Sequence, residues 1–160
     1  MSSSDKAPRS AVLGTEISET EIQDGLTRAE YGVLSLTNGN ETYGIPLSFG
    51  YDETIETIYF MLAFDEGSKK REFLQTTRTA SLTVVDTDLP DNWTSVLITG
   101  PVTPVPTDET TTAYAALADT AEFPAMYTFE EYFDMETTEQ SLYQLTVESL
   151  SGRRSTPEEA

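Results

Sequence analysis

Residues 32–102 read GVLSLTNGNETYGIPLSFGYDETIETIYFMLAFDEGSKKREFLQTTRTASLTVVDTDLPDNWTSVLITGPV, and this stretch decides the fold. Runs of aliphatic, β-branched and aromatic residues alternate with turns rich in Asn, Gly, Asp and Pro. Short strands at a spacing of roughly ten residues, joined mostly by hairpins, predict a small antiparallel barrel. A basic segment, GSKKR at residues 67–71, interrupts the strands.

Six segments are predicted as strands. Asn38-Gly39-Asn40 has the composition of a tight hairpin between the first two of them. Pro46 lies inside the second, so it requires an edge, a bulge or a ligand-facing position where its missing N–H does no harm. The strand segments are residues 31–37, 42–51, 55–64, 79–86, 93–102 and 141–150.

Four segments are predicted as helices: residues 17–26, 69–77, 108–119 and 128–135. Ser18 or Thr20 can cap the first helix and Ser68 the second. We therefore expect a mainly β fold, a six-stranded antiparallel barrel with peripheral helices. It forms a single domain over residues 16–152, between a mobile N-terminal arm (1–15) and a mobile C-terminal tail (153–160).

The chain of 160 residues contains no cysteine and no histidine. This excludes disulfides, zinc–thiolate sites and Ser-His triads, and we assign no metal-binding residue. Any reaction must use carboxylates, tyrosines, lysines or a cofactor. The sequence shows neither an apolar run of membrane-spanning length nor a secretory signal, so we expect a cytoplasmic protein with no membrane partner.

The net charge is −19, from 28 acidic and 9 basic residues. Such a surface repels nucleic acid and anionic lipid. The acidic residues are spread along the whole chain, which is typical of halophilic proteins that work in concentrated, screening salt. The alternative is an acidic surface for a basic partner, but the charge is not localised enough to favour it.

Four of the nine basic residues lie between positions 69 and 78: Lys69, Lys70, Arg71 and Arg78. Cations at a helix N-terminus cost roughly 0.3–1 kcal/mol each when exposed. A bound anion reverses that sign, because it would meet free N–H groups, the Ser68 hydroxyl and two lysines together. A phosphate site and a local neutralisation by Asp65, Glu66 and Glu72 both remain open from the residues alone.

The motifs Gly67-Ser-Lys-Lys70, Phe73-Leu74 and Ala80-Ser-Leu-Thr83, in this order, resemble the pyridoxamine 5′-phosphate oxidase-like family of FMN-binding split barrels. Pro46-Leu-Ser-Phe-Gly-Tyr-Asp52, Ile58-Tyr-Phe60 and Thr99-Gly-Pro-Val102 are similar to its second, third and fifth strands. The resemblance covers about residues 25–150.

The resemblance implies a split β-barrel that forms a homodimer, with FMN in the cleft between the subunits. Lys69 and Lys70, beside Ser68, would hold the phosphate. The other implied cofactor contacts come from three strands: Ile45, Pro46, Leu47, Ser48, Phe49, Ala63, Phe64, Trp93 and Ser95. Pro46 alternatively marks an edge strand, and aromatics such as Phe64 and Trp93 are more often core or dimer-interface residues than flavin contacts. Arg153 and Arg154 are either a solvated tail or phosphate contacts across the dimer.

The absence of histidine departs from several branches of the family. The Arg-x-His substrate element of true pyridoxamine phosphate oxidases is missing, as are the histidines of the nitroimidazole-reductase and haem-degrading branches. Apart from these branches, the resemblance implies an FMN-dependent oxidoreductase that passes hydride or electrons to a small acceptor. A non-catalytic flavin-binding or storage protein and an F420-dependent reductase are the alternatives. No catalytic residue is assigned, and Tyr43, Tyr51 and Tyr59 are the only candidate acids.

Overall fold

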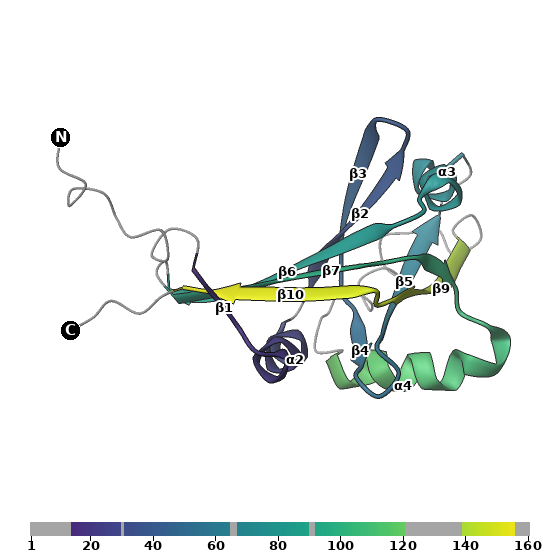
Figure 1. The fold of residues 1–160 in the computed structure, drawn as a ribbon. Helices are drawn as coiled ribbons and strands as arrows, with labels where there is room; N and C mark the ends of the chain where they lie inside the picture. Colours follow the sequence, from purple (N-terminus) through teal and green to yellow (C-terminus); the bar gives the residue numbers. More distant parts are fainter. Residues whose placement is uncertain (1–13, 30, 65–66, 90–91, 121–138, 156–160) are drawn as a thin grey trace, which may run out of the picture.

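The computed structural model describes residues 14–29, 31–64, 67–89, 92–120 and 139–155. The described strands form two antiparallel sheets (Figure 1). The six-stranded sheet has the order β1-β10-β7-β6-β2-β3, and the four-stranded sheet has the order β4-β5-β9-β8. The bounds are β1 (Thr15–Glu16), β2 (Gly32–Asn38), β3 (Glu41–Leu47), β4 (Gly50–Asp52), β5 (Thr57–Phe64), β6 (Ala80–Leu89), β7 (Asn92–Gly100), β8 (Val102–Pro104), β9 (Glu139–Thr146) and β10 (Ser149–Arg154).

This architecture confirms the predicted split β-barrel with peripheral helices. The β2–β3 hairpin closes where expected, with Asn38 paired to Glu41. Gly39 has a positive φ of 60° and Asn40 does not, which is the pattern of a type II′ turn. Pro46 lies on β3, an edge strand of the six-stranded sheet, so its missing N–H leaves no ladder bond unmade.

Three predicted strands are each two shorter strands, because the chain passes from one sheet to the other within them. The predicted strand 42–51 divides into β3 and β4 after Leu47. The segment 93–102 divides into β7 and β8 at Pro101, and 141–150 divides into β9 and β10 after Thr146. At the last corner, Val147 N–H donates to Glu56 in front of β5, whereas Glu148 N–H donates to Thr99 of β7.

The helices pack on the barrel from outside the sheets. They are α2 (Glu19–Arg28), α3 (Lys69–Thr76) and α4 (Thr110–Thr120), the last preceded by a 3-10 turn, η2 (Thr107–Glu109). Ser18 is the N-cap of α2, and its hydroxyl accepts from Glu21 N–H at 3.3 Å. The predicted helix at 128–135 and most of the predicted N-terminal arm lie outside the described residues.

The main core fills the space between the two sheets and beneath α2 and α3. Leu34, Phe49, Phe60 and Leu82 are fully buried there. A second, smaller cluster lies between β5 and α4, where Tyr59 packs against Ala113 and Leu117. Helix α4 therefore explains why β5 is apolar on both faces, a pattern that sequence alone attributes either to a helix or to a second subunit.

The last strand continues through Arg153 and Arg154, whereas the sequence analysis begins the tail at Arg153. Arg153 pairs in register with Ser95 and Glu16, and Arg154 pairs with Thr94 and Thr15. The ladder with β7 and β1 holds these two residues in the sheet. Within the described part of the chain, no helix is long and apolar enough to cross a membrane.

Gly50→Ala is expected to destabilise the protein because α4 packs directly on this glycine. A Cβ on Gly50 would lie 2.6 Å from Leu117 N and against the Ala116 carbonyl group. Since the α4 backbone must move, we expect a loss of about 1–3 kcal/mol in the free energy of unfolding, measured by denaturant titration in concentrated salt. Gly44→Ala is the matched control, because its Cβ would meet only Val33 Cγ1 at 3.5 Å. Equal stability of the two variants would contradict the packing described here.

Candidate functional site

The start of α3 combines three features that suit an anion. Ser68 occupies the N-cap position, but its side chain makes no capping hydrogen bond, in contrast to Ser18 at the start of α2. Lys69 and Lys70 follow in the first turn, with Lys69 exposed and Lys70 half-buried. A helix N-terminus carries a partial positive charge and N–H groups without helical partners. The first turn of α3 therefore presents donors and positive charge together.

The end of β5 positions this turn. Lys70 Nζ donates to the Ala63 carbonyl at 3.1 Å, and the ammonium group has two further hydrogens. The Arg71 guanidinium lies 4.9 Å from the centre of the Phe64 ring. Lys69 Nζ lies 6.0 Å from the Phe73 ring centre. Glu72, one of the three acids that could neutralise the cluster, accepts from Asn38 Nδ2 at 3.4 Å.

The predicted contact segment 45–49 divides between two environments. Ile45, Leu47 and Phe49 are buried in the main core, so their side chains point away from any ligand outside the barrel. Pro46 is exposed and Ser48 is half-buried. Of these five residues, Pro46 and Ser48 can offer side chains to a ligand, and the others can offer only backbone. Phe64 is also a core residue, with its ring 5.9 Å from Tyr143 in an edge-on contact.

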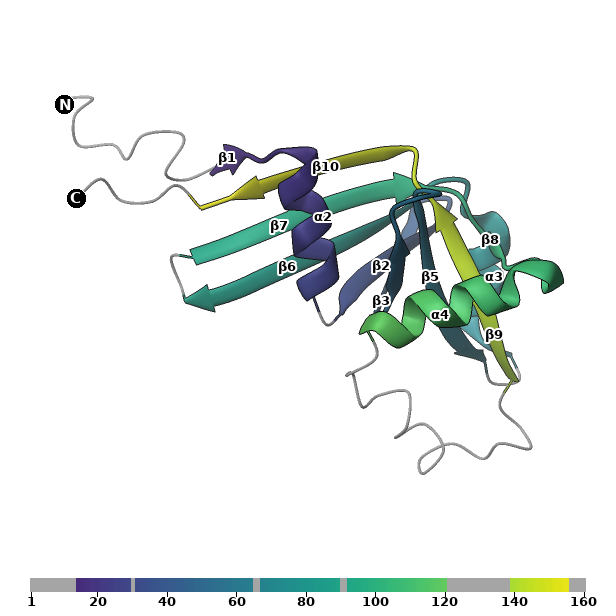
Figure 2. The ribbon, with the colours of Figure 1, turned by 90° about the horizontal axis from the view of Figure 1, so that it is seen from below.

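Trp93 and Ser95 lie at the other end of the six-stranded sheet from α3. The β6–β7 ladder runs from the Ala80–Gly100 pair, next to the end of α3, to the Thr87–Trp93 pair. At about 3.3 Å per residue, Trp93 is roughly 23 Å from Gly100. Figures 1 and 2 both place α3 and the end of β6, beside the start of β7, at opposite ends of the described structure. A single chain therefore does not bring all the predicted contact residues together.

One face of the six-stranded sheet carries almost no charge, a feature that the sequence analysis missed. Side chains alternate between faces along each strand. On the face away from the core, Val33, Val85 and Leu97 are exposed by 37–56%. In Figure 1 helix α2 lies below β6, β7 and β10, and no described element covers their other side. We call this uncovered side the outward face.

Arg153 is the sole charged side chain on the outward face of β10, β7, β6, β2 and β3 among the residues whose side chains are described. The sequence does contain a signal for this face. Every second residue on β7, β6, β2 and β3 is uncharged, although the chain as a whole is rich in carboxylates. The outward positions are Ser149, Ser151 and Arg153 on β10, Trp93, Ser95, Leu97 and Thr99 on β7, Ser81, Thr83, Val85 and Thr87 on β6, Val33, Ser35 and Thr37 on β2, and Thr42, Gly44 and Pro46 on β3.

The three candidate tyrosines do not converge on one site. Tyr43 packs on Phe73 at 5.5 Å between ring centres. Burial raises the pKa of the Tyr51 phenol, and the neighbouring Glu56 carboxylate raises it further. Tyr59 is fully buried beneath α4, and its hydroxyl has no hydrogen-bond partner among the residues that the structure describes. Burial, together with Asp52 and Glu109, raises the pKa of the Tyr59 phenol. Both phenols therefore stay protonated at neutral pH, and no general base emerges from them.

We also examined the acidic residues as possible metal ligands. Among the residues that the structure describes, Asp and Glu side chains form no group of three that could hold a metal ion.

Comparison with known proteins places the chain in a structural context. The family model described as pyridoxamine 5′-phosphate oxidase matches residues 18–154. No curated protein matches the chain.

Solved structures share the fold at low sequence identity. An FAD-binding protein from Mesorhizobium loti has a TM-score of 0.70 at 18% identity, covering 90% of this chain and 99% of that one. An FAD-binding protein from Mycobacterium smegmatis has a TM-score of 0.65 at 19% identity, covering 89% and 99%. An FAD- and heme-binding protein from the same organism has a TM-score of 0.62 at 17% identity, covering 89% and 75%.

The buried phenols predict a loss of stability at alkaline pH. The pKa of tyrosine in an unfolded chain is about 10. Below this pH the phenols are protonated in both the folded and the unfolded protein, so their full contribution to the free energy of unfolding is present. Above it the unfolded chain releases the proton first, so the free energy of unfolding falls as pH rises toward the raised pKa of the folded state. Urea titrations at pH 8 to 11 measure this slope.

Tyr59→Phe should reduce that alkaline loss and raise stability at pH 8 by about 1 kcal/mol, since it removes a buried hydroxyl that has no partner. Tyr114→Phe is the control, because Tyr114 is 49% exposed. An unchanged alkaline slope in Tyr59→Phe would show that this phenol does not contribute to it.

Proposed function

The chain belongs to the pyridoxamine 5′-phosphate oxidase family, and we propose that it binds FMN and passes hydride or electrons between the flavin and a small acceptor. The observation that carries the proposal is the first turn of α3. A chain with a net charge of −19 keeps Lys69, Lys70 and Arg71 consecutive at a helix start, beside a serine that does not cap its own helix. We further propose that the protein is a cytoplasmic homodimer.

The phosphate of FMN would take the place that the capping side chain occupies in α2. There the Ser18 hydroxyl accepts from the first turn, and Glu19 and Glu21 supply negative charge. In α3 the Ser68 side chain makes no capping hydrogen bond, and Lys69, Lys70 and Arg71 outnumber the single acid of the first turn, Glu72. An external dianion would therefore accept from the N–H groups and pair with the lysines. Lys69 is the more accessible of the two. Lys70, held on Ala63 by one hydrogen bond, would offer its remaining hydrogens from a fixed position.

The remaining residues of the proposed site bind and orient. Pro46 and Ser48 face away from the core on β3 and its continuation, and they would border the ligand. The buried Ile45, Leu47, Phe49 and Phe64 would support this border from within the barrel. Bound FMN would itself supply the hydride and electron chemistry, and we assign no side chain as acid or base.

The outward face supports the homodimer. Five strands at about 4.8 Å spacing and some seven residues at about 3.3 Å give a face on the order of 600 Å² per copy. Two copies would bury about 1,200 Å² in total, at the lower bound of specific interfaces. Val85 and Leu97 are 56% and 45% exposed, and like charges would not meet across this face.

A twofold axis running across the strands would complete the flavin site. It would lay the Trp93–Ser95 end of one copy over the α3 end of its partner, and the reverse. The two sets of predicted contacts, which lie at opposite ends of one chain, would then meet twice in the dimer. Trp93 is half-buried on the outward face and could pack its ring against a flavin.

The phosphate anchor can be tested directly. Lys69→Ala with Lys70→Ala should weaken FMN binding roughly 100-fold or more, because each charge-assisted contact contributes about 1.5–3 kcal/mol. Flavin absorbance during titration in concentrated salt gives the affinity, and circular dichroism checks the fold. Arg78→Ala, a nearby exposed cation outside the helix, is the control and should bind normally.

Wild-type affinity in the double variant would sink the phosphate assignment. Mass analysis of the cofactor released from the purified protein separates FMN from FAD, which the solved relatives bind, and from F420. Stoichiometric flavin without turnover of any acceptor would favour a storage protein instead.

Contribution in trans can be tested by complementation between defective chains. Neither the Lys69→Ala, Lys70→Ala chain nor the Trp93→Ala chain should bind FMN with full affinity alone. A heterodimer of the two, purified through different tags, should bind one FMN per dimer at wild-type affinity, because one of its sites is intact. If both halves of a site came from the same chain, every site in the heterodimer would carry a defect and full affinity would not return.

A further inference from the structure

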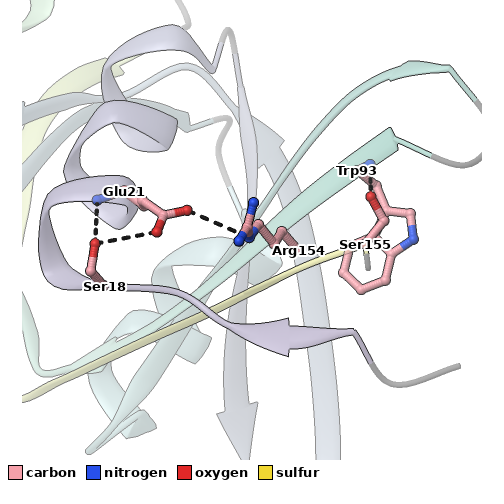
Figure 3. Close-up of polar contacts among 5 residues, drawn as sticks. All are labelled: Ser18, Glu21, Trp93, Arg154 and Ser155. Atoms are coloured by element: carbon pink, nitrogen blue, oxygen red, sulfur yellow. Dashed lines mark hydrogen bonds and ion pairs between the residues drawn. The ribbon is translucent and has the colours of Figure 1, made fainter. Parts of the chain in front are cut away.

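Both ends of the described chain meet at Trp93. Ser155 N–H donates to the Trp93 carbonyl at 2.9 Å, and Trp93 N–H donates to Ser155 Oγ at 3.1 Å. Figure 3 shows Ser155 beside Trp93 at the start of β7, with the Arg154–Glu21 ion pair nearby. This reciprocal pair of bonds lies beyond the last residue of β10 and fixes the first residues of β7.

The N-terminal end supports the indole itself. Gly14 packs so closely that a Cβ there would lie 2.7 Å from Cη2 of the Trp93 ring. Gly14 has a φ of +72°, which glycine adopts without strain. Arg153 Nη2 donates to the Gly14 carbonyl at 3.4 Å, and β1 continues from there in register with β10. The ring is therefore held by Gly14 and the backbone by Ser155.

We propose that Ser155 and Gly14 form a terminal clamp that positions Trp93 as a fixed aromatic surface for the flavin ring. This rests on the proposed function, in which Trp93 reaches the flavin held by a second copy. Ser155 and Gly14 are positioning residues, since they act through Trp93 and not on the flavin.

The need for a clamp follows from the place of Trp93 in the sheet. It lies near the tip of a long hairpin, where strand ends open most readily. An aromatic ring contributes to stacking only while its orientation is held, because ordering it on binding costs free energy. In the described part of the chain, the start of β7 receives this support from the two terminal segments, β1 and β10 with the residues next to them, which lie together on the side of β7 away from β6.

Trp93 is the single tryptophan of the chain, so its fluorescence reports on the clamp without a label. Ser155→Ala removes the hydroxyl that accepts from Trp93 N–H. Gly14→Ala introduces a Cβ into the space of the indole. Ser141→Ala is the control, because it removes a half-buried serine hydroxyl from β9, in the four-stranded sheet, away from both the outward face and Trp93.

In the flavin-free protein, both clamp variants should lower the fluorescence anisotropy of Trp93 and raise its quenching by acrylamide, relative to wild type and to Ser141→Ala. On FMN titration, wild-type Trp93 emission should be strongly quenched. Both clamp variants should bind FMN about 3- to 10-fold more weakly, with incomplete quenching at saturation. The thermal midpoint of Ser155→Ala should stay close to that of Ser141→Ala. Gly14→Ala should melt at a lower temperature, because its Cβ also meets the Arg154 carbonyl and its φ is positive.

Wild-type anisotropy, acrylamide quenching and FMN affinity in both clamp variants would overturn the clamp. FMN binding that leaves wild-type Trp93 emission unchanged would also overturn it, while the phosphate anchor would stand. A wild-type protein that binds no flavin would instead overturn the proposed function, and the flavin-free anisotropy and acrylamide data would then decide the clamp.

Discussion

The close backbone contact between two corners of the barrel constrains the rest of the fold. At Gly100 the chain leaves the six-stranded sheet for β8, and a Cβ there would run into the Thr146 carbonyl. At Thr146 the chain is about to return from β9 to β10, and its N–H donates to Pro101 at 3.1 Å. The two crossings therefore lie against each other. This contact fixes the angle between the sheets, and with it the place where β5 ends and α3 begins.

The same corners leave the six-stranded sheet covered on one side only. Helix α2 and the four-stranded sheet occupy the core side, as Figure 2 shows for α2 across β6, β7 and β10. The outward face has Val, Leu, Ser and Thr where the rest of the surface has carboxylates. In a chain of net charge −19, a face without carboxylates on β10, β7, β6, β2 and β3 is one where two copies could approach with little repulsion between like charges. The absence of carboxylates and the exposure of apolar side chains at alternate positions thus both point to the outward face as the surface for the proposed dimer.

The sequence predicted most elements but not how they connect. Alternation identified β2, β5 and β6, and Ser68 marked the start of α3 correctly. The first helix was predicted over residues 17–26 with Ser18 or Thr20 as its cap, and α2 begins after Ser18. The corners were missed, since period-two alternation continues through a residue such as Ser48 whether or not the hydrogen-bonding partner changes. Arg153 and Arg154 were read as tail for a related reason. Their pairing with β1 and β7 is a long-range contact that no local pattern records.

The two parts of the candidate site differ in the same way: one could be predicted from neighbouring residues, and the other depends on residues far away in the sequence. The basic turn at α3 could be found because it is contiguous and because lysine is rare elsewhere in the chain. The environment of Trp93 could not, because it depends on Gly14 and Ser155, which lie far from Trp93 in the sequence. The length of β6 and β7 separates these two halves by most of a sheet. Within its own chain, the described end of this long hairpin lies far from α3, whereas the antiparallel partner that we propose would place its α3 beneath it. The stiffness of this end of the hairpin would then matter to the site as much as the lysines, since it would determine whether the second half arrives already ordered.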